Sequence, residues 1–310
     1  MRFGWIIISV ILSSGAWSFA QAQVTYTTTN YADAFLATGS PANPEGADLT
    51  GLNFGGAGTL VVAPASSLKG EFQSVIKFNL SNGIALFNTA CGTNNWTIGA
   101  VSLELTSNYG MDGVQPNNPI FNIISGGQFV IEWLSDDDWV EGTGNPNLPT
   151  TDGVTYDSLP SLLMGPHEPL CTNTYTPPGV NIPVTWTLSL STNLVADIAA
   201  GGDVTFLFYA ADNQINYLFN SYSYGRGNEP LIHVTANPVL RILSGSFTNS
   251  LFHLTGVGCT NLPYQIQASS NLAATNWQTI GTVTADSAGL IQFDDTNALG
   301  QVQRFYRFSR

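Results

Sequence analysis

Charged residues are scarce in this chain, and basic residues are scarcer than acidic ones. Only 9% of the 310 residues are charged, with 8 Lys and Arg against 21 Asp and Glu. Lys69 and Lys77 are the only lysines. The formal net charge of −13 repels phosphate backbones and anionic lipid surfaces, so the composition argues against nucleic acid and membranes as partners. An acidic, amide-rich surface suits neutral ligands or divalent cations instead.

Long hydrophobic runs are missing beyond the N-terminus. No later stretch approaches the roughly 20 apolar residues that span a bilayer, so we expect no membrane insertion. The N-terminus has the pattern of a secretory signal: Arg2 is followed by an apolar run at 5–12 and by a small-x-small site at 20–22. We therefore expect a signal peptide at 1–22 and a secreted or cell-surface protein that starts near Gln23.

Cysteine is also rare, with 3 in the chain. An exported protein meets an oxidising environment, and three cysteines allow at most one intramolecular disulfide. Cys91 and Cys171 lie in the same half of the chain, so we predict that they pair. Cys259 is then left as a buried, unreactive thiol. No two cysteines have the spacing of a zinc site.

Helix-period hydrophobic stripes are almost absent, and period-two alternation takes their place. Val101, Leu103 and Leu105 alternate with polar residues, which is typical of a half-buried strand. The one helix candidate covers 193–200, ahead of two glycines. Many strands with long connections predict an all-β, jelly-roll β-sandwich for residues 23–236. The strand candidates are residues 59–63, 74–80, 101–105, 128–134, 184–190, 204–210 and 231–236.

A second domain is predicted from residue 237 onwards, because Pro238 interrupts the preceding strand pattern. Shorter strand candidates follow at intervals of about ten residues, which is typical of a small β-sandwich at 237–310. At this size the domain is near the lower limit for independent folding. These candidates are residues 252–256, 264–269, 277–284, 290–294 and 304–308.

Aromatic and acidic residues gather in one glycine-rich segment, residues 133–144, with a second loop at 151–156. Trp139 and Tyr156 offer aromatic faces for a sugar ring, where apolar contact and nearby polar groups give binding. Asp136 and Asp138 are weak calcium candidates, because they lack the ligand spacing of an EF-hand. A solvated acidic turn explains the same carboxylates. No other cofactor is indicated.

A second aromatic group lies at 222–226. In an extended segment, Tyr222 and Tyr224 lie on one side, with Arg226 beside them. We predict that all three contact a ligand, whereas the alternative is that one tyrosine belongs to the core.

Catalytic motifs are missing as well. No Gly-x-Ser-x-Gly elbow marks a nucleophile. His233 and His253 lie within strand patterns and His167 in a loop. Four carboxylates, of Glu132, Asp136, Asp138 and Glu141, are close in sequence and provide an alternative, a pair for polysaccharide cleavage. The sequence predicts no catalytic residue.

Several stretches of the first part of the chain form an ordered set. They are Ala-Asp-Ala-Phe at 32–35, Asn-Phe-Gly at 53–55, residues 74–80, residues 100–105, Asp-Trp-Val-Glu-Gly-Thr-Gly at 138–144, Phe-Asn-Ser at 219–221 and residues 228–234. In this order they give residues 31–236 a resemblance to the DNRLRE domain family. The resemblance implies a carbohydrate-binding-type jelly roll of secreted and cell-surface proteins. The chain departs from the family at 221–223, where Ser-Tyr-Ser replaces a Ser-Arg-Glu-like triplet.

Residues 264–308 resemble a fibronectin-type-III-like C-terminal module of secreted bacterial proteins. The marks are the segment 264–272, then Trp277, Gly-Thr-Val at 281–283, Phe-Asp-Asp at 293–295 and Arg-Phe-Tyr-Arg at 304–307. The resemblance implies an accessory module without a defined ligand. Ile266, Trp277 and Tyr306 are interpreted as its core.

Together these patterns predict a secreted, non-catalytic protein that binds an extracellular or cell-surface polysaccharide through its first domain. Two alternatives remain at this stage. One is a structural cell-surface or matrix protein with no glycan ligand, and the other is a glycosidase or lyase.

Overall fold

Antiparallel strands make up most of the computed structural model, which describes residues 23–42, 47–108, 125–176, 181–225, 227–273 and 275–309. This confirms the predicted all-β sandwich class. The predicted signal peptide at 1–22 lies outside the described residues. Within those residues, no helix is both long enough and apolar enough to cross a membrane.

The chain forms two compact units. The sandwich unit contains residues 26–84 and 100–234, and the C-terminal unit contains the described residues among 1–25, 85–99 and 235–310. The last segment of the C-terminal unit begins at residue 235, two residues before the predicted boundary at 237. The C-terminal unit differs from the predicted domain because it also takes in the segment 85–99.

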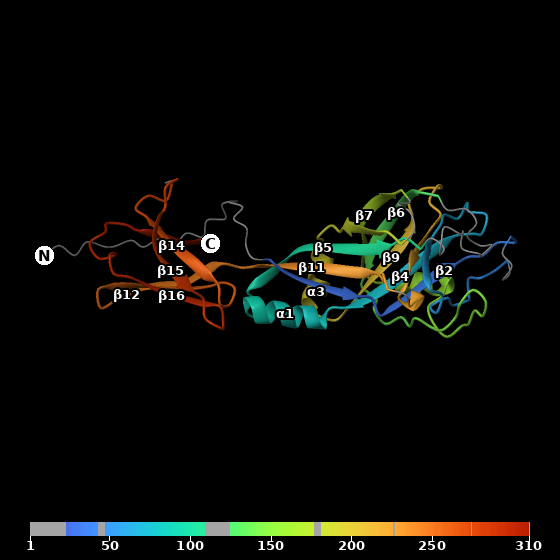
Figure 1. Cartoon of the computed structure of the whole chain (residues 1–310), viewed down its shortest axis with the longest axis horizontal. Coiled ribbons are helices and arrows are strands. Elements are labelled where there is room, and N and C mark those ends of the chain that lie inside the picture. Colours follow the sequence, from blue (N-terminus) through green and yellow to red (C-terminus); the bar gives the residue numbers. More distant parts are fainter. Residues whose placement is uncertain are drawn as a thin grey trace. The chain divides into compact units, whose positions relative to one another are not determined.

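One sheet of the sandwich unit has five strands in the order β2-β4-β9-β6-β7 (Figure 1). Each pair of neighbouring strands is antiparallel. The sheet is apolar on both faces, because one face meets the second sheet and the other is covered by a loop. The strands are β2 (Ala32–Ala37), β4 (Phe72–Asn79), β9 (Asp203–Ala210), β6 (Gly127–Leu134) and β7 (His167–Tyr175).

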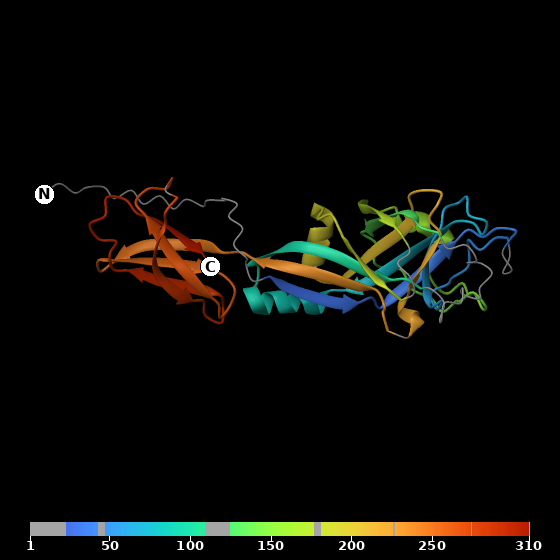
Figure 2. The ribbon, with the colours of Figure 1, turned by 45° about the horizontal axis from the view of Figure 1, so that its top comes forward.

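The second sheet has the order β1-β11-β5-β8, and a short pair, β10-β3, lies beside it in the fold. The strands β1, β11 and β5 can be followed by colour in Figure 2. Aromatic side chains fill the space between the sheets: Phe129 of β6 packs edge-on against Trp186 of β8, with ring centroids 5.3 Å apart. The strands are β1 (Val24–Thr29), β11 (Leu231–Pro238), β5 (Trp96–Thr106), β8 (Pro183–Thr187), β10 (Tyr217–Asn220) and β3 (Thr59–Val62).

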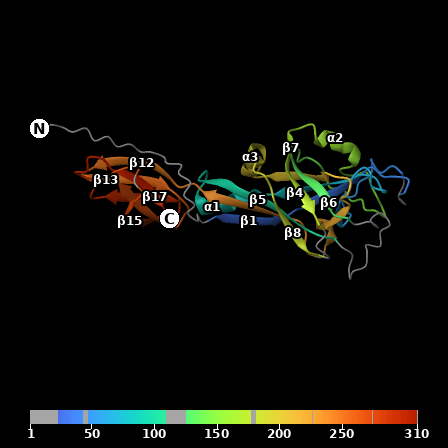
Figure 3. The same cartoon turned by 90° about the horizontal axis from the view of Figure 1, so that it is seen from above.

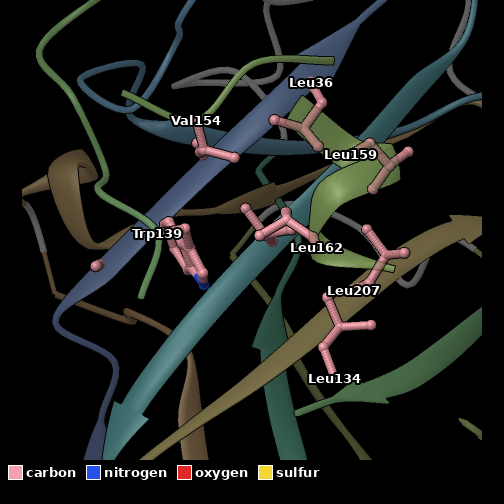
Figure 4. Close-up of a cluster of buried hydrophobic side chains, with 10 residues drawn as sticks. Leu36, Leu134, Trp139, Val154, Leu159, Leu162 and Leu207 are labelled. Carbon is pink, nitrogen blue, oxygen red and sulfur yellow. The ribbon is translucent and has the colours of Figure 1, made fainter. Parts of the chain in front are cut away.

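The connection between β6 and β7 covers the outer face of the five-stranded sheet. It contains the short helices η3 (Tyr156–Ser158) and α2 (Leu159–Leu162), and Figure 3 shows α2 beside β7. Figure 4 shows Leu159 and Leu162 lying over Leu207 and Leu134 of the sheet. This contact buries an apolar cluster that the strand pattern alone did not indicate.

Two longer helices occur among the described residues. The predicted helix is confirmed as α3 (Thr192–Ala200), where the Ser191 hydroxyl accepts a hydrogen bond from the Leu194 N–H and Gly201 ends the helix in the left-handed region. The other, α1 (Ser81–Cys91), was not predicted. Its buried stripe is Gly83, Phe87 and Cys91, and only one of these residues is a large hydrophobe.

The C-terminal unit contains two three-stranded antiparallel sheets, in the orders β12-β13-β16 and β15-β14-β17. Ile266 is fully buried between them, as predicted, and Tyr306 packs against the same core. Trp277 differs from the prediction, because it is partly exposed and its ring carries the Arg307 guanidinium at 4.6 Å. The strands are β12 (Arg241–Thr248), β13 (Leu251–Val257), β14 (Pro263–Ser269), β15 (Gln278–Thr284), β16 (Leu290–Asp295) and β17 (Phe305–Ser309).

The cysteines contradict the predicted Cys91–Cys171 pairing. The Sγ atoms of Cys91 and Cys259 lie 3.1 Å apart, whereas the Cys171 Sγ accepts a hydrogen bond from the Asn173 amide. The physical reason is the unit boundary: Cys91 belongs to the C-terminal unit with Cys259, and Cys171 belongs to the sandwich unit. Closeness in sequence was therefore a poor guide to closeness in space.

Candidate functional site

Tyr222 is the predicted binding residue that the structure leaves most accessible. It begins the single turn η4 (Tyr222–Tyr224), which directly follows β10 and Ser221 and ends at Gly225 with a left-handed backbone. This turn corrects the prediction of an extended segment, in which Tyr222 and Tyr224 would lie on one side of the chain. The side chain of Tyr222 is 48% exposed, and Tyr224 is half-buried. Arg226, the third predicted residue of this group, lies outside the described residues.

A buried carboxylate fixes the backbone of this turn. The Tyr222 N–H donates to Asp33 Oδ2 at 2.7 Å, and the Asn30 side-chain amide donates to the same oxygen at 2.6 Å. Asp33 is only 1% exposed. The pKa of Asp33 is raised to about 7, because burial and, to a smaller extent, the nearby Glu141 carboxylate outweigh the hydrogen bonds that lower it.

Glu141 connects the same aspartate to the acidic, glycine-rich loop. Its Oε1 accepts a hydrogen bond from the Asp33 backbone N–H at 3.0 Å, and burial raises the pKa of Glu141. The two carboxylates therefore serve as anchors between β2, the loop and the η4 turn. In this arrangement Glu141 supports the backbone of the site.

The Asn53 side chain lies at the centre of the hydrogen bonds that hold the acidic, glycine-rich loop. Its amide nitrogen donates to the carbonyls of Glu141 and Val154 at 2.7 and 2.8 Å, and its oxygen accepts from the N–H groups of Gly55 and Gly144, both at 3.1 Å. A Cβ at Gly144 would lie 1.9 Å from the Asn53 carbonyl oxygen. The glycines of the loop are therefore needed for close backbone packing around this fully buried amide.

Trp139 belongs to the core, which corrects the prediction that it contacts a ligand. It is 7% exposed and lies in the apolar cluster of Figure 4. Its indole N–H donates to the Thr205 hydroxyl at 3.1 Å. The loop folds back over the outer face of the sheet because this large apolar ring gains free energy by leaving water.

Lys77 occupies the face of the same indole ring. Its ammonium lies 4.6 Å from the Trp139 ring centroid and donates to the carbonyls of Asp137 and Trp139 at 2.6 and 2.8 Å. Lys77 is 5% exposed, and its ammonium group satisfies carbonyl groups that the folded loop directs inward. One of the two lysines of the chain thus holds the loop to β4.

Tyr156 is also tied into the fold. Its ring packs against the cluster around Trp139, and its hydroxyl donates to Glu71 Oε2 at 2.9 Å. Burial, followed by Glu71, raises the pKa of Tyr156 to about 12. Because the ring and the hydroxyl of Tyr156 both contact other residues of the protein, Tyr156 has less free surface for a ligand than Tyr222 has.

The calcium candidates form a turn. Asp136 Oδ1 accepts a hydrogen bond from the Asp138 N–H at 2.9 Å, a common use of aspartate in loops. Among the residues that the structure describes, no group of three or more His, Cys, Asp or Glu side chains is placed to hold a metal ion.

Glu132, a member of the alternative catalytic set, has partners of its own. Its Oε1 lies 2.5 Å from His167 Nδ1, and burial together with Glu132 raises the pKa of Tyr209 to about 12. His167 is the first residue of β7, which corrects its prediction as a loop residue. Glu132, Asp136 and Glu141 are thus directed at three different partners.

The sequence reasoning missed the polar residues that build this region: Asp33, Asn53 and Lys77. A signal for two of them was present, because Asp33 lies in the otherwise apolar strand β2 and Lys77 lies between Ile76 and Phe78. Buried charges are rare without a partner, so each of these positions pointed to a specific hydrogen-bond network. Asn53 had no comparable signal, since asparagine is ordinary in a surface turn.

No protein-family model and no curated protein sequence matches the chain. Solved structures of β-glucuronidase from Ruminococcus gnavus show a weak likeness. The complex with C6-substituted uronic isofagomine is 9% identical, covering 97% of this chain and 46% of that one, with a TM-score of 0.23. A second crystal structure of that enzyme is 8% identical with the same coverage and a TM-score of 0.21. This chain spans less than half of their length, and a likeness at this TM-score supports no functional inference.

Proposed function

We propose that this chain is a secreted, non-catalytic protein that binds an extracellular or cell-surface polysaccharide at the η4 turn of its sandwich unit. The observation that carries the proposal is the exposed Tyr222 ring on a backbone held by the buried Asp33. An aromatic ring on a fixed backbone loses little conformational freedom when a sugar ring stacks on it. Tyr224 on the same turn extends the surface, and Arg226 stays a predicted contact.

A neutral glycan is the ligand class that the charges favour. The chain carries a formal net charge of −13, and Arg226 is the only Lys or Arg at positions 215–235. A strongly anionic polymer would meet long-range repulsion and only one nearby cation. Hydroxyl and amide groups at neighbouring positions suit sugar hydroxyls. The resemblance to the DNRLRE family implies a carbohydrate ligand without specifying its charge.

Affinity electrophoresis of the full chain through gels containing neutral polysaccharides tests this proposal. We expect retardation by at least one polymer, and a Kd about fivefold higher for Tyr222→Ala because a ring contact is worth about 1 kcal/mol. Tyr222→Phe keeps the ring and should keep most of the affinity. Phe247→Ala, at a 38% exposed aromatic of the C-terminal unit, is the matched control and should not change retardation.

Two results would contradict the proposal. The structural alternative gains support if no polymer retards the chain while deletion of the protein weakens the cell surface. The enzymatic alternative predicts released saccharide products that disappear in Glu141→Gln. The structural role of Glu141 predicts instead that Glu141→Gln folds normally, because the glutamine oxygen can still accept the hydrogen bond from the Asp33 N–H.

A further inference from the structure

Two cysteines from distant parts of the sequence meet inside the C-terminal unit. Cys91 is the last residue of α1, and Cys259 lies between β13 and β14. Their Sγ atoms are 3.1 Å apart, and the residues are 0% and 2% exposed. Because 168 residues separate them in the chain, the contact is made only by the tertiary fold.

Backbone hydrogen bonds hold both cysteines in place. The Thr260 N–H donates to the Ala90 carbonyl at 3.0 Å, and the Thr260 hydroxyl donates to the same oxygen at 3.1 Å. The Cys259 N–H donates to the Tyr264 hydroxyl at 2.6 Å. The neighbours of the two cysteines are therefore joined independently of the sulfur atoms, so the close approach does not depend on side-chain mobility.

Close packing of glycine supports the same arrangement. Gly92, directly after Cys91, has a φ of +84°, and a Cβ there would lie 3.3 Å from the Ala288 carbonyl oxygen. The segment 85–99 and the 286–289 turn therefore approach within van der Waals contact on this side as well.

We propose that Cys91 and Cys259 form the one disulfide of this protein. The two thiols lose two protons and two electrons when the S–S bond forms. A disulfide donor, such as a thiol–disulfide oxidoreductase or oxidised glutathione, takes up the two protons and two electrons and is reduced to two thiols. In the cell the reaction depends on the export that belongs to the proposed function. It is independent of glycan binding.

The bond forms most readily before the unit has closed. The two thiols are 0% and 2% exposed, and burial, followed by the neighbouring Cys259, raises the pKa of Cys91, so the folded chain offers little reactive thiolate to an external disulfide. Exchange therefore proceeds on the folding chain, and the finished disulfide is shielded from external thiols. Cys171 is half-buried in β7 of the sandwich unit and stays a thiol.

The cross-link retains the segment 85–99 in the C-terminal unit. Without it, local opening frees this segment at the cost of a few hydrogen bonds. With it, opening has to keep Cys91 beside Cys259, which removes most open conformations.

Refolding of the full chain with reduced and oxidised glutathione tests the inference. We expect one titratable thiol per chain after denaturation without reductant, and a peptide map that joins Cys91 to Cys259. Reduction should speed proteolytic cleavage within 85–99 by about tenfold. Cys171→Ser is the matched control and should leave the cross-link and the cleavage rate unchanged.

Three titratable thiols after refolding, or a cross-link that contains Cys171, would overturn the inference. The double variant Cys91→Ala/Cys259→Ala provides a second test of the inference. It should fold, resist oxidation and show the fast cleavage of the reduced protein. Retardation in the polysaccharide gels should be the same for this variant, so failure of the disulfide and failure of glycan binding give different results.

Discussion

At the scale of single residues, buried polar groups decide how the candidate site is built. Asp33 is placed on β2 among alanines, phenylalanine and leucine, with its carboxylate inside the fold. Removing an ionised carboxylate from water is costly, and the hydrogen bonds from Asn30 and Tyr222 offset only part of that cost. Because Asp33 accepts a hydrogen bond from the Tyr222 N–H, the stability of the fold around the η4 turn should depend on pH.

Asp33→Asn tests this pH dependence. The folded-state pKa of Asp33 is raised from 3.8 to about 7, so the native chain holds a proton that the unfolded chain releases. The contribution of Asp33 to stability is therefore most favourable below pH 4 and falls as the pH rises to 7, by roughly 4 kcal/mol. Asparagine keeps an oxygen for both donors and stays neutral, so the difference in unfolding free energy between variant and wild type should grow over this range.

Urea unfolding at a series of pH values measures the effect. Burial raises the pKa of Asp137 and Glu141 as well, so the wild-type curve contains their contributions, and only the difference between the two chains reports Asp33. The exposed Asp138→Asn is the control. A difference that does not change with pH would show that Asp33 is ionised in the folded protein throughout.

Trp139→Phe tests whether Trp139 is a core residue or a ligand contact. The smaller ring leaves a gap in the cluster of Figure 4 and loses the bond to Thr205, so we expect a loss of about 2 kcal/mol of stability. Polysaccharide retardation should not change. Weaker retardation with unchanged unfolding would restore Trp139 as a ligand contact.

At the scale of elements, the connection between β6 and β7 is held to the fold by buried side chains. It contains no long helix or strand, yet it buries Trp139, Val154, Leu159 and Leu162 and surrounds Asn53. Its glycines allow backbone to pass close to backbone.

Gly144→Ala tests that role. The added Cβ would lie 1.9 Å from the Asn53 carbonyl oxygen, so the loop has to shift, at a cost of about 2–4 kcal/mol in unfolding free energy. Gly202→Ala is the matched control, because nothing lies within 4 Å of its added Cβ. Thermal unfolding of both variants compares them, and equal melting temperatures would contradict close packing at Gly144.

The strand elements themselves follow well from the sequence. All seven strand ranges predicted in the first part of the chain, and all five in the second, overlap observed strands, because alternation of polar and apolar residues is a local property of a half-buried strand. Five strands were missed: β1, β2, β7, β10 and β12. The strands β2 and β10 are buried at every position, so they show no alternation. The strand β7 carries Pro169 and polar residues at the edge of its sheet, and almost every residue of β12 is exposed. The strand β1 does alternate and was overlooked.

At the scale of the whole molecule, the composition of the C-terminal unit is the main departure from the expected domain organisation. Residues 85–99 come from the middle of the predicted first domain but pack with residues 235–309. The Val239 N–H donates to the Asn95 carbonyl at 2.7 Å, and the Arg241 guanidinium donates to the Asn95 side chain at 3.2 Å. The predicted domain at 237–310 therefore lacks part of its own structure.

The isolated fragment 237–310 should be less stable than the same residues in the full chain. It loses the hydrogen bonds to Ala90 and Asn95 and exposes Cys259, in a domain that already has a small core. Hydrogen exchange of the amides in β13 and β14 measures this, and we expect faster exchange in the fragment. Equal protection would show that the segment 85–99 contributes nothing to the unit.

The sequence by itself determined the all-β class, most strand positions, the capped helix α3 and a change of unit close to residue 237. These features depend on side-chain periodicity and on local backbone preferences, which neighbouring residues supply. Only the tertiary structure decided that Trp139 is buried while Tyr222 is exposed, that Cys91 meets Cys259, and that the segment 85–99 joins the C-terminal unit. Each of these depends on contacts between residues far apart in the chain, and such contacts follow from how sheets and loops pack to remove apolar surface from water.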